Sequence, residues 1–467
     1  MSATTTHDHP TRSTAANVLV VSVAAFLASL DLFIVNIAFP EIRSAFGATD
    51  LGALSWVLNA YTVVFAAFLN PAGRLGDRYG HRRIFLSGLT VFLLGSLACG
   101  LSPSLALLIA ARVVQAVGAA MLMPSSLALL MAAVPAERRT VAVSTWAAVG
   151  AMAAALGPPI GGLLVEFDWR WIFFVNLPLG VLALAVAPGV LPKVTTGGSG
   201  VPDLFGALSL VVGVAALVWA IVEIPAADAT VAKIFAAAAL AVGALGLAIW
   251  RSTRHHTPAI DLAAIRVHPM WSSSVALLLF AAAFGAMLLG NVMLLTTIWH
   301  ETPALAGLCL SPGPVVVVLV SLTLASRLIS KHGTGAIAAL GAAIYAAGIV
   351  FWLFRVDVEP HYLADFLPGQ ILTGAGVGLV IPSLSGVTGK ALPANQWGSG
   401  SALTNTARQL GTVLGTAILT MVYQSGISMS SVRFGWDLIA ASAAAAALIA
   451  VALAFGWKTT LEGGQLS

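Results

Sequence analysis

Long runs of apolar residues alternate with short polar connections along almost the whole chain. Each run has about 20 residues, the length that a helix needs to cross the hydrocarbon core of a bilayer. The runs lack the strict alternation of membrane β-strands. The pattern therefore predicts an all-α integral membrane protein with about fourteen spans. The expected spans are 17–40, 54–72, 84–102, 105–127, 141–165, 172–191, 205–224, 231–250, 274–298, 305–326, 335–355, 362–386, 401–424 and 437–457.

The composition excludes a soluble enzyme. Of the 467 residues, 59% are hydrophobic and only 9% are charged, with a mean hydropathy of +0.97, whereas soluble domains carry roughly 25% charged residues. The net charge of +4 comes without a basic run, so no nucleic-acid partner is expected. No phosphate-binding G-x-x-x-x-G-K-[ST] sequence occurs, so ATP is not the expected energy source. The histidines and two cysteines form no ligand pattern, and we expect no metal or other cofactor.

The positive charges predict the orientation in the membrane. If the N-terminus is cytoplasmic, fifteen of the 22 lysines and arginines fall in inside connections, five fall outside and two fall within spans. Such a bias is the positive-inside pattern of multi-pass proteins. It supports an even number of spans and places both termini in the cytoplasm.

The chain also contains an internal repeat. The pattern R-L-x-x-[RK]-aromatic-G at 74–80 recurs 253 residues later at 327–333, and the Gly…Pro-Ser pattern at 118–125 recurs at 376–383. Two like halves are the usual construction of secondary transporters. The expected segments are a cytoplasmic tail 1–16, a six-helix half 17–191, two inserted helices 205–250, a second six-helix half 274–457 and a cytoplasmic tail 458–467.

Ionisable residues within the spans are candidates for function, because burying a charge at the bilayer centre costs about 2.5–3.5 kcal/mol or more. Asp31 in the first span and Arg112 in the fourth lie at nearly the same height and can meet. Burial favours a protonated carboxylate and a neighbouring arginine favours an ionised one, a balance that suits proton binding and release. The alternative is a static ion pair that fixes helix packing. Glu223, near an outer end, is either a further proton-coupling residue or simply wetted at the interface.

Two polar residues stand out in the thirteenth span. Arg408 lies in its lower third, with Asn405 one turn earlier. The arginine either extends to the cytoplasmic surface or lines a cavity.

A conspicuous motif connects the second and third spans. Its glycines allow a tight turn and a close helix approach, and its acid can meet an arginine or a helix N-terminus. The spacing resembles motif A of the major facilitator superfamily, a cytoplasmic gate motif. Its residues are Gly73, Asp77, Arg78, Gly80, Arg82 and Arg83.

Further motifs resemble the fourteen-helix drug:proton antiporter branch of the same superfamily, and the resemblance covers nearly the whole chain. They are the first-span segment 30–40, motif B from Arg112 through Gln115, the segment 169–180, and the antiporter motif Gly150, Gly157, Pro158, Gly161 and Gly162.

The resemblance implies roles for individual residues. Asp31 and Arg112 would couple transport to protons. Asp77, with Arg78 and Arg82, would latch the cytoplasmic side in an outward-open state. The glycines of the antiporter motif would shape the fifth span, although plain close packing of small residues explains them as well. The expected substrate cavity comprises Asn36, Trp56, Tyr61, Gln115, Asn405 and Arg408.

Taken together, these observations predict a transporter of a bacterial inner membrane, acting as a monomer and not an enzyme. Its expected function is proton-coupled export of hydrophobic or weakly basic compounds by alternating access. Weakly basic, neutral or lipophilic substrates are favoured over multiply charged cations because the second half contains no clear membrane acid.

Two departures from the family pattern stand out, Phe33 in place of a small hydroxyl residue and Ser330 at the repeat position of Asp77. The alternatives are a dedicated exporter of one endogenous metabolite, peptide or lipid, and an uncoupled uniporter or sensor.

Overall fold

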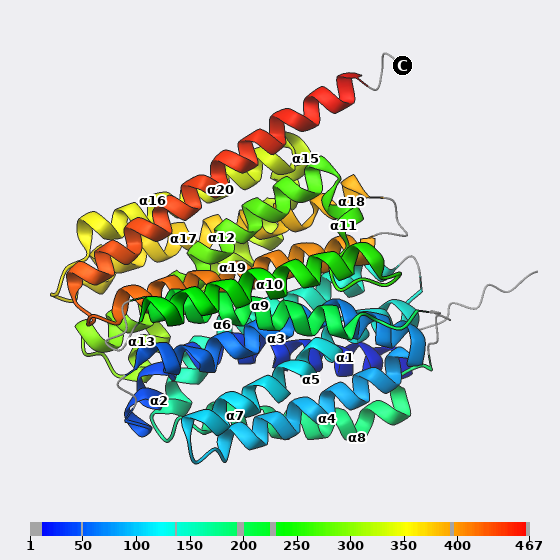
Figure 1. The fold of residues 1–467 in the computed structure, drawn as a ribbon, viewed down its shortest axis with the longest axis horizontal. Coiled ribbons are helices and arrows are strands. Elements are labelled where there is room, and N and C mark those ends of the chain that lie inside the picture. The colour runs from blue at the N-terminus through cyan, green and yellow to red at the C-terminus, as the bar shows by residue number, and fades with distance from the viewer. Residues whose placement is uncertain are drawn as a thin grey trace, which may run out of the picture.

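The computed structural model describes residues 12–47, 50–135, 138–193, 200–224, 230–392 and 397–463 as a bundle of long helices without any strand (Figure 1). In these residues, thirteen helices are long and apolar enough to cross a membrane. A further long helix, α19 (Trp397–Tyr423), lies in the same bundle and completes the expected fourteen. The all-helical fold class is therefore confirmed.

The first part of the chain forms six membrane helices. The most extensive contacts join α4 to α5, α3 to α5 and α1 to α6, and α1 also contacts α5 and α8. The elements are α1 (Arg12–Ile37), the short α2 (Phe39–Ala45), α3 (Leu51–Tyr79), α4 (His81–Gly100), α5 (Leu105–Ala133), α6 (Arg139–Val165), and α7 (Trp171–Phe174) followed by α8 (Asn176–Val190).

The last part of the chain forms six further spans, several of which contain a π-helical turn. The elements are the short α11 (Leu262–Ile265), α12 (His268–Met293) with η2 (Leu294–Ile298), the run α13 (Pro303–Leu310), α14 (Pro312–Val320), η3 (Ser321–Ala325) and α15 (Ser326–His332), then α16 (Thr334–Arg355), η4 (Tyr362–Phe366) with α17 (Leu367–Ser385), the short α18 (Val387–Ala391), α19, and α20 (Met429–Gly463).

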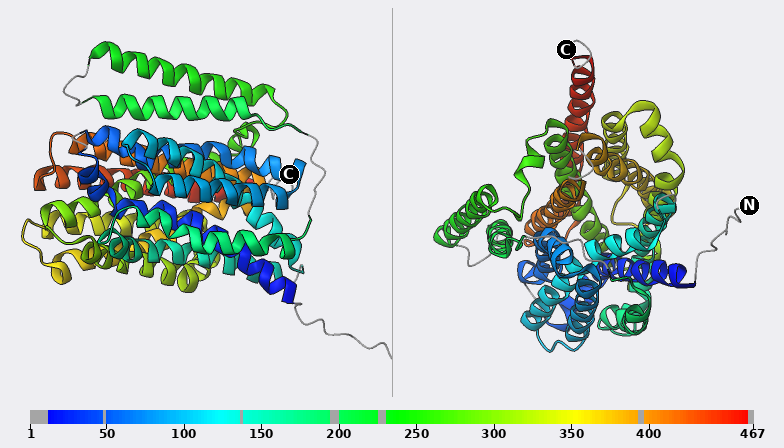
Figure 2. Two further views of the ribbon diagram at one scale, coloured as in Figure 1. Left: turned by 90° about the horizontal axis from the view of Figure 1, so that it is seen from below. Right: turned by 90° about the vertical axis from the view of Figure 1, so that its right-hand side faces the viewer.

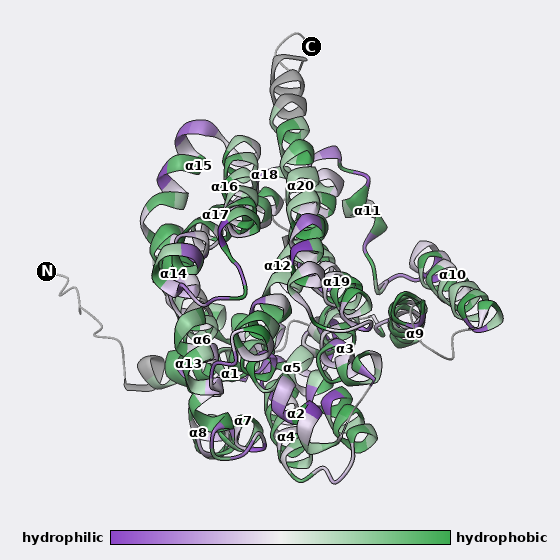
Figure 3. Cartoon of the chain, turned by 90° about the vertical axis from the view of Figure 1, so that its left-hand side faces the viewer, coloured by the Kyte–Doolittle hydropathy of each residue, from purple (hydrophilic) through white to green (hydrophobic). Residues whose placement is uncertain are grey.

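Two helices stand at the edge of the bundle. α9 (Leu204–Glu223) packs against α3 and α19, and α10 (Val231–Arg254) packs against α9 on the far side from the bundle (Figure 2). The α10 side chains Val231, Phe235, Leu240 and Val242 are exposed, and hydrophobic colour covers most of α9 (Figure 3). Apolar outer faces of this kind suit contact with lipid.

The helices begin and end where the sequence supplies the necessary groups. The side chains of Asp50, Ser104 and Thr230 accept hydrogen bonds from the first backbone N–H groups of α3, α5 and α10, which otherwise lack partners.

The helix that enters the gate motif continues to Tyr79, so the motif is mostly helical. Only Gly80, with φ +95°, makes the turn that the sequence predicted for the whole connection, because glycine alone adopts this conformation without strain.

The ends of the chain also differ slightly from the expected spans. α1 begins at Arg12, within the predicted tail 1–16, and α20 continues to Gly463, within the predicted tail 458–467. Residues 1–11 and 464–467 of these tails lie outside the described part of the chain.

The internal repeat has a structural counterpart at matching positions. Gly80 and Gly333 both have a positive φ, +95° and +87°. A Cβ placed on Gly118 of α5 would lie 2.8 Å from the carbonyl oxygen of Gly88 in α4. A Cβ on Gly376 of α17 would lie 2.6 Å from the carbonyl oxygen of Gly341 in α16. In both halves, therefore, backbones touch where a side chain would prevent it.

α19 is the least apolar long helix of the bundle, and its position explains why. It packs between α3 and α12 and supplies a polar face to a central cavity. Thr412, Thr416 and Thr420 each donate a hydrogen bond to the carbonyl oxygen four residues earlier, at 3.0, 2.9 and 2.8 Å. Their hydroxyl groups are thus satisfied within the helix, which lowers the cost of placing them in a membrane.

Replacing Gly118 or Gly376 by alanine should destabilise the protein, since each new methyl group would meet backbone atoms of the neighbouring helix. We expect each substitution to cost about 1–3 kcal/mol and to lower the thermal unfolding midpoint of the detergent-purified protein. Gly243→Ala is the matched control, because no atom lies within 4 Å of its Cβ position. An unchanged midpoint for both Gly118→Ala and Gly376→Ala would contradict this account of the repeat.

Candidate functional site

A charged pair lies in the interior of the first half. Asp31 of α1 and Arg112 of α5 form an ion pair between Oδ2 and Nη1, and their exposed fractions are 0% and 1%. Gln115, one turn after Arg112, bonds both partners. Its Nε2 donates to Asp31 Oδ1 at 2.8 Å and its Oε1 accepts from Arg112 Nη1 at 2.7 Å. Both carboxylate oxygens of Asp31 are therefore engaged, an arrangement that stabilises a buried charge.

Neighbouring helices extend this polar cluster. Gln115 Nε2 also donates to Ser96 Oγ of α4 at 3.2 Å, and Asn176 Nδ2 of α8 donates to the same oxygen at 3.0 Å. Arg112 Nε donates to the carbonyl oxygen of Val57 in α3 at 3.0 Å. Ser96 is not among the site residues predicted from the sequence. Its only signal was a hydroxyl in an apolar span, which is too common to be diagnostic.

An aromatic ring covers the arginine. The Arg112 guanidinium carbon lies 4.1 Å from the ring centre of Tyr61, close enough for a cation–π interaction. The Tyr61 hydroxyl donates to the carbonyl oxygen of Ala28 at 3.4 Å, and its ring stacks on Phe65. Protonation of Asp31 would weaken the ion pair while leaving the arginine held by the ring, Val57 and Gln115.

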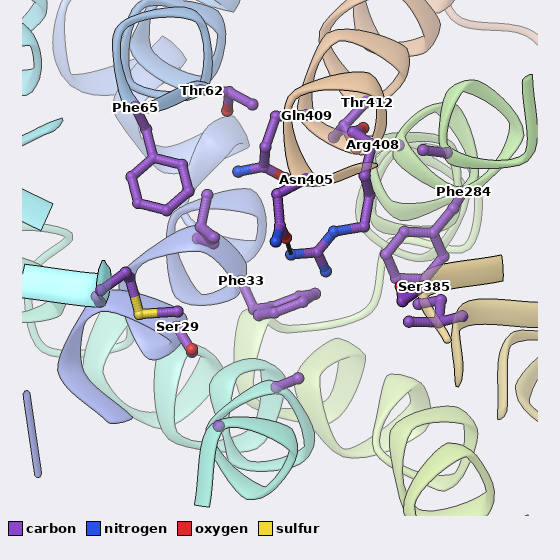
Figure 4. Close-up of a pocket in the computed structure, with 18 of the residues that line it drawn as sticks. Ser29, Phe33, Thr62, Phe65, Phe284, Ser385, Asn405, Arg408, Gln409 and Thr412 are labelled. Carbon is purple, nitrogen blue, oxygen red and sulfur yellow. Dashed lines mark hydrogen bonds between the residues drawn. The ribbon is translucent and has the colours of Figure 1, made fainter. Parts of the chain in front are cut away.

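A cavity of about 1160 Å³ lies between the two halves. Its wall is mostly apolar, and Arg112, the ion-pair partner of Asp31, is among the residues that line it. Asn36, Asn405 and Arg408, which the sequence placed in a substrate cavity, also line it. Figure 4 shows Arg408 extending from α19 into the cavity beside Asn405.

The remaining residues of the expected cavity lie elsewhere. Tyr61 and Gln115 are fully buried around Arg112 and are not part of the cavity wall. Trp56 packs against a hydrophobic cluster that joins α3, α9 and α19. The sequence alone does not show which side of a helix faces the cavity.

An aromatic pair joins the halves across the cavity. Phe33 of α1 and Phe284 of α12 have ring centres 6.5 Å apart in an edge-to-face arrangement, and both line the cavity (Figure 4). The sequence marked Phe33 only as a departure from the family pattern. It gave no signal for Phe284, whose role depends on packing between residues distant in sequence.

The gate motif lies at one end of this cavity. Gly73 and Asp77 line the cavity, and Asp77 Oδ1 lies 3.1 Å from Nε2 of His81 at the start of α4. Arg82 bonds the carbonyl oxygen of Pro188 at the end of α8. The motif thus connects α3, α4 and α8. The structure pairs Asp77 with His81, whereas the latch involving Arg78 and Arg82 belongs to an outward-open state and stays a prediction. Arg78 and Arg83 are exposed.

The antiporter motif packs α6 closely on α1. A Cβ on Gly157 would lie 2.8 Å from Phe33 Cβ, one on Gly161 would lie 2.8 Å from Ile34 Cγ1, and one on Gly150 would lie 3.5 Å from Ser29 Oγ.

The end of the same motif meets the second half. A Cβ on Gly162 would lie 3.0 Å from Ala304 Cα, and the backbone of Pro158 touches Gly307 in α13. These contacts close the bundle between α6 and α13 at the end opposite the gate motif. The cavity is therefore bounded by packed glycines at one end and by the gate motif at the other.

Glu223, the third expected proton-coupling residue, lies apart from the Asp31 cluster. It ends α9, with its carboxylate 3.7 Å from Lys233 Nζ at the start of α10. This ion pair links the two peripheral helices, and its partly exposed lysine limits its strength.

Removing Arg112 alone should destabilise the protein strongly. Arg112→Gln would leave Asp31 buried without its partner, which typically costs about 3–5 kcal/mol. The double variant Asp31→Asn/Arg112→Gln should recover part of that loss, because no unpaired charge remains. Thermal unfolding of the wild type, both single variants and the double variant gives the coupling energy. Additive effects of the two substitutions would show that the pair contributes no specific interaction.

Comparisons with known proteins agree with this architecture. Two solved structures share the fold at low sequence identity. They are the inward-open xylose transporter XylE from E. coli (TM-score 0.66, 12% identity, 94% of this chain and 95% of that chain) and a bacterial homologue of the human drug peptide transporters PepT1 and PepT2 (TM-score 0.66, 15% identity, 94% and 98%).

Curated relatives are more similar in sequence. Multidrug resistance protein Stp of Mycobacterium tuberculosis (strain CDC 1551 / Oshkosh) is 34% identical over 86% of this chain and 74% of its own length. The Methylenomycin A resistance protein of Bacillus subtilis (strain 168) is 31% identical over 94% of both chains. The Tetracenomycin C resistance and export protein of Streptomyces glaucescens is 31% identical over 88% and 76%. The family model described as Major Facilitator Superfamily matches residues 21–416, and the chain therefore belongs to this superfamily of multi-pass membrane transporters.

Proposed function

We propose that this transporter is a proton-driven exporter that expels hydrophobic compounds by alternating access. The observation that carries the proposal is that Arg112 belongs both to the buried ion pair and to the lining of the cavity. Its guanidinium is paired with the fully buried Asp31, and Arg112 is also among the residues that line the 1160 Å³ cavity. A change in the protonation of Asp31 would therefore alter the electrostatic environment of the cavity in which a substrate binds.

The coupling step follows from this geometry. When Asp31 binds a proton, its charge is lost and its ion pair with Arg112 weakens. The guanidinium then has an unsatisfied charge at the cavity wall, which changes the affinity of the cavity for its contents. Release of the proton restores the pair. Proton and substrate thus influence the same residue, which is the requirement for exchange of one against the other.

Alternating access is supported by the unequal ends of the cavity. The halves are packed together through Gly162 and Pro158 at one end, whereas the gate motif borders the cavity at the other. The distribution of positive charge assigns the gate-motif end to the cytoplasm. In this orientation, the cavity would load substrate from the cytoplasm or the inner leaflet, with both termini cytoplasmic.

In this proposal, the segments 17–191 and 274–457 are the two moving halves of a monomer, and 205–250 is a lipid-facing addition to them. The ion pair between Asp203 at the start of α9 and Arg251 near the end of α10, with an N–O distance of 2.9 Å, keeps the added helices together. Their contact with α3 and α19 would allow them to follow one half during the cycle.

A dedicated exporter of a single compound is the second candidate. Two relatives carry names that refer to one antibiotic each, methylenomycin A and tetracenomycin C, whereas Stp is named as a multidrug resistance protein. A resistance screen in an efflux-deficient host separates the two candidates, because a dedicated exporter protects against one chemical family and a multidrug exporter against several.

Asp31→Asn should abolish proton-driven transport, because asparagine has nearly the shape of aspartate but cannot exchange a proton. In energised inside-out vesicles, we expect uptake of a compound identified by the resistance screen to fall at least tenfold. Asp437→Asn, the same chemical change at an exposed position of α20, is the matched control and should transport normally. Uptake at the wild-type rate by Asp31→Asn would refute proton coupling through this residue.

A further inference from the structure

We infer that the cavity selects amphipathic compounds with a carboxylate group, and that Arg408 is the residue that binds this group. The inference depends on the proposed function only in taking the central cavity as the substrate site. It names the substrate class and concerns the second half of the molecule, whereas the proton chemistry was assigned to the first half.

The charges of the cavity wall are unbalanced in the described structure. Three arginines line the cavity, at positions 74, 112 and 408, against a single carboxylate, Asp77. Asp77 lies beside His81, and Arg112 is neutralised by Asp31 from behind the wall. Arg408 forms no ion pair with any residue in the described ranges. Its place in the middle of the bundle makes an uncompensated charge costly, and an anionic ligand would offset that cost.

The guanidinium of Arg408 is oriented by the protein yet left with free donors. Asn405 Nδ2 donates to the carbonyl oxygen of Ser401 at 3.0 Å, so its Oδ1 is directed away and accepts from Arg408 Nη2 at 3.0 Å. A guanidinium has five N–H groups. Within the described part of the chain, Asn405 Oδ1 is the one side-chain acceptor that bonds the Arg408 guanidinium. The remaining N–H groups can bind both oxygens of a carboxylate, the geometry that arginine favours.

A second donor lies on the same helix. Gln409 lines the cavity and is only 5% exposed, and among the described residues its Nε2 has no hydrogen-bond partner. An unsatisfied buried donor costs about 1–3 kcal/mol. The cavity face of α19 therefore offers an excess of donors, which suits a ligand that brings acceptors.

The surroundings of Arg408 are apolar and aromatic. Arg408, Phe33 and Phe284 line the same cavity (Figure 4), and the two rings come from opposite halves and contact each other. A ligand with a carboxylate at Arg408 would place an aromatic or aliphatic body against these rings. The weakly basic compounds favoured by the scarcity of membrane acids would bring a like charge to Arg408, which lowers their affinity. The structure thus shifts the expected substrate from a weak base to a weak acid.

The test measures binding of three probes that share a naphthalene ring and differ in the charge of the head group. Full-length protein in lipid nanodiscs is titrated calorimetrically at pH 7 with 2-naphthoate, 2-naphthamide and 2-naphthylmethylammonium, without a proton gradient. We expect 2-naphthoate to bind most tightly and the ammonium compound most weakly. Arg408→Gln should weaken 2-naphthoate binding at least tenfold and change 2-naphthamide binding by less than twofold.

Two further variants control for indirect effects. Arg408→Lys keeps the charge but loses the two-pronged geometry, so it should recover part of the 2-naphthoate affinity, and it decides the question if Arg408→Gln does not fold. Arg433→Gln removes an exposed arginine of α20 that pairs with Asp357 at 3.5 Å, and it should bind all probes like the wild type.

Three results would overturn the inference: no binding of 2-naphthoate, a preference for the ammonium probe, or equal losses for carboxylate and amide in Arg408→Gln. These results are separable from the transport proposal, because binding needs no gradient. Proton-driven export that is lost in Asp31→Asn, together with no carboxylate preference, would retain the proposed function and reject this inference. Carboxylate selectivity with transport unaffected by Asp31→Asn would retain this inference and reject proton coupling through Asp31.

Discussion

The arrangement of the first half depends on keeping one negative charge stable inside a membrane protein. Asp31 is completely buried, and an isolated carboxylate there would be prohibitively costly. Its two oxygens are held by Arg112 and Gln115, and these residues are fixed in turn by groups from α3 and α4. The ion pair therefore dictates how four helices approach one another. In the proposed mechanism, a step that neutralises Asp31 would weaken these contacts and so connect a single proton to the packing of the first half.

The two halves share a backbone plan while differing in their charged residues. The glycine contacts between α4 and α5 recur between α16 and α17 at the repeat spacing. However, the position equivalent to Arg112 is Gln370, a neutral residue that is 3% exposed and lines the cavity. The second half has its cation instead on α19, at Arg408. In the proposed cycle, symmetric packing would support a rocking motion of similar halves, and asymmetric chemistry would let one half respond to protons while the other contacts the substrate.

Much of this structure could be predicted from sequence because membranes impose strong rules. Span length follows from the bilayer, and it located all fourteen helices, although α3 and α5 continue six or seven residues beyond the predicted spans and α12 begins six residues before its span. α19 was found despite its polarity because its flanks were clear. The sequence also singled out Asp31 and Arg112, since charged residues in spans are rare. It could not predict Ser96, Gln409 or Phe284, because nothing local distinguishes a polar or aromatic residue that faces a cavity from one that faces a neighbouring helix.

The same limit explains why Tyr61 and Gln115 were expected at the cavity yet lie behind it. Residues at the same depth on one helix can face opposite directions, and only the packing of other helices decides which direction opens onto the cavity. In this protein, that packing leaves Arg112 shared between the two sides, with Tyr61 and Gln115 holding it from the interior. Arg408 has no corresponding carboxylate in the described residues. Two arginines that line one cavity thus differ, since the charge of Arg112 is compensated by Asp31 whereas that of Arg408 is not compensated by any described carboxylate. That difference follows from three-dimensional packing, and it is the reason that the chemistry of the cavity could be read from the structure and not from the spacing of charges along the chain.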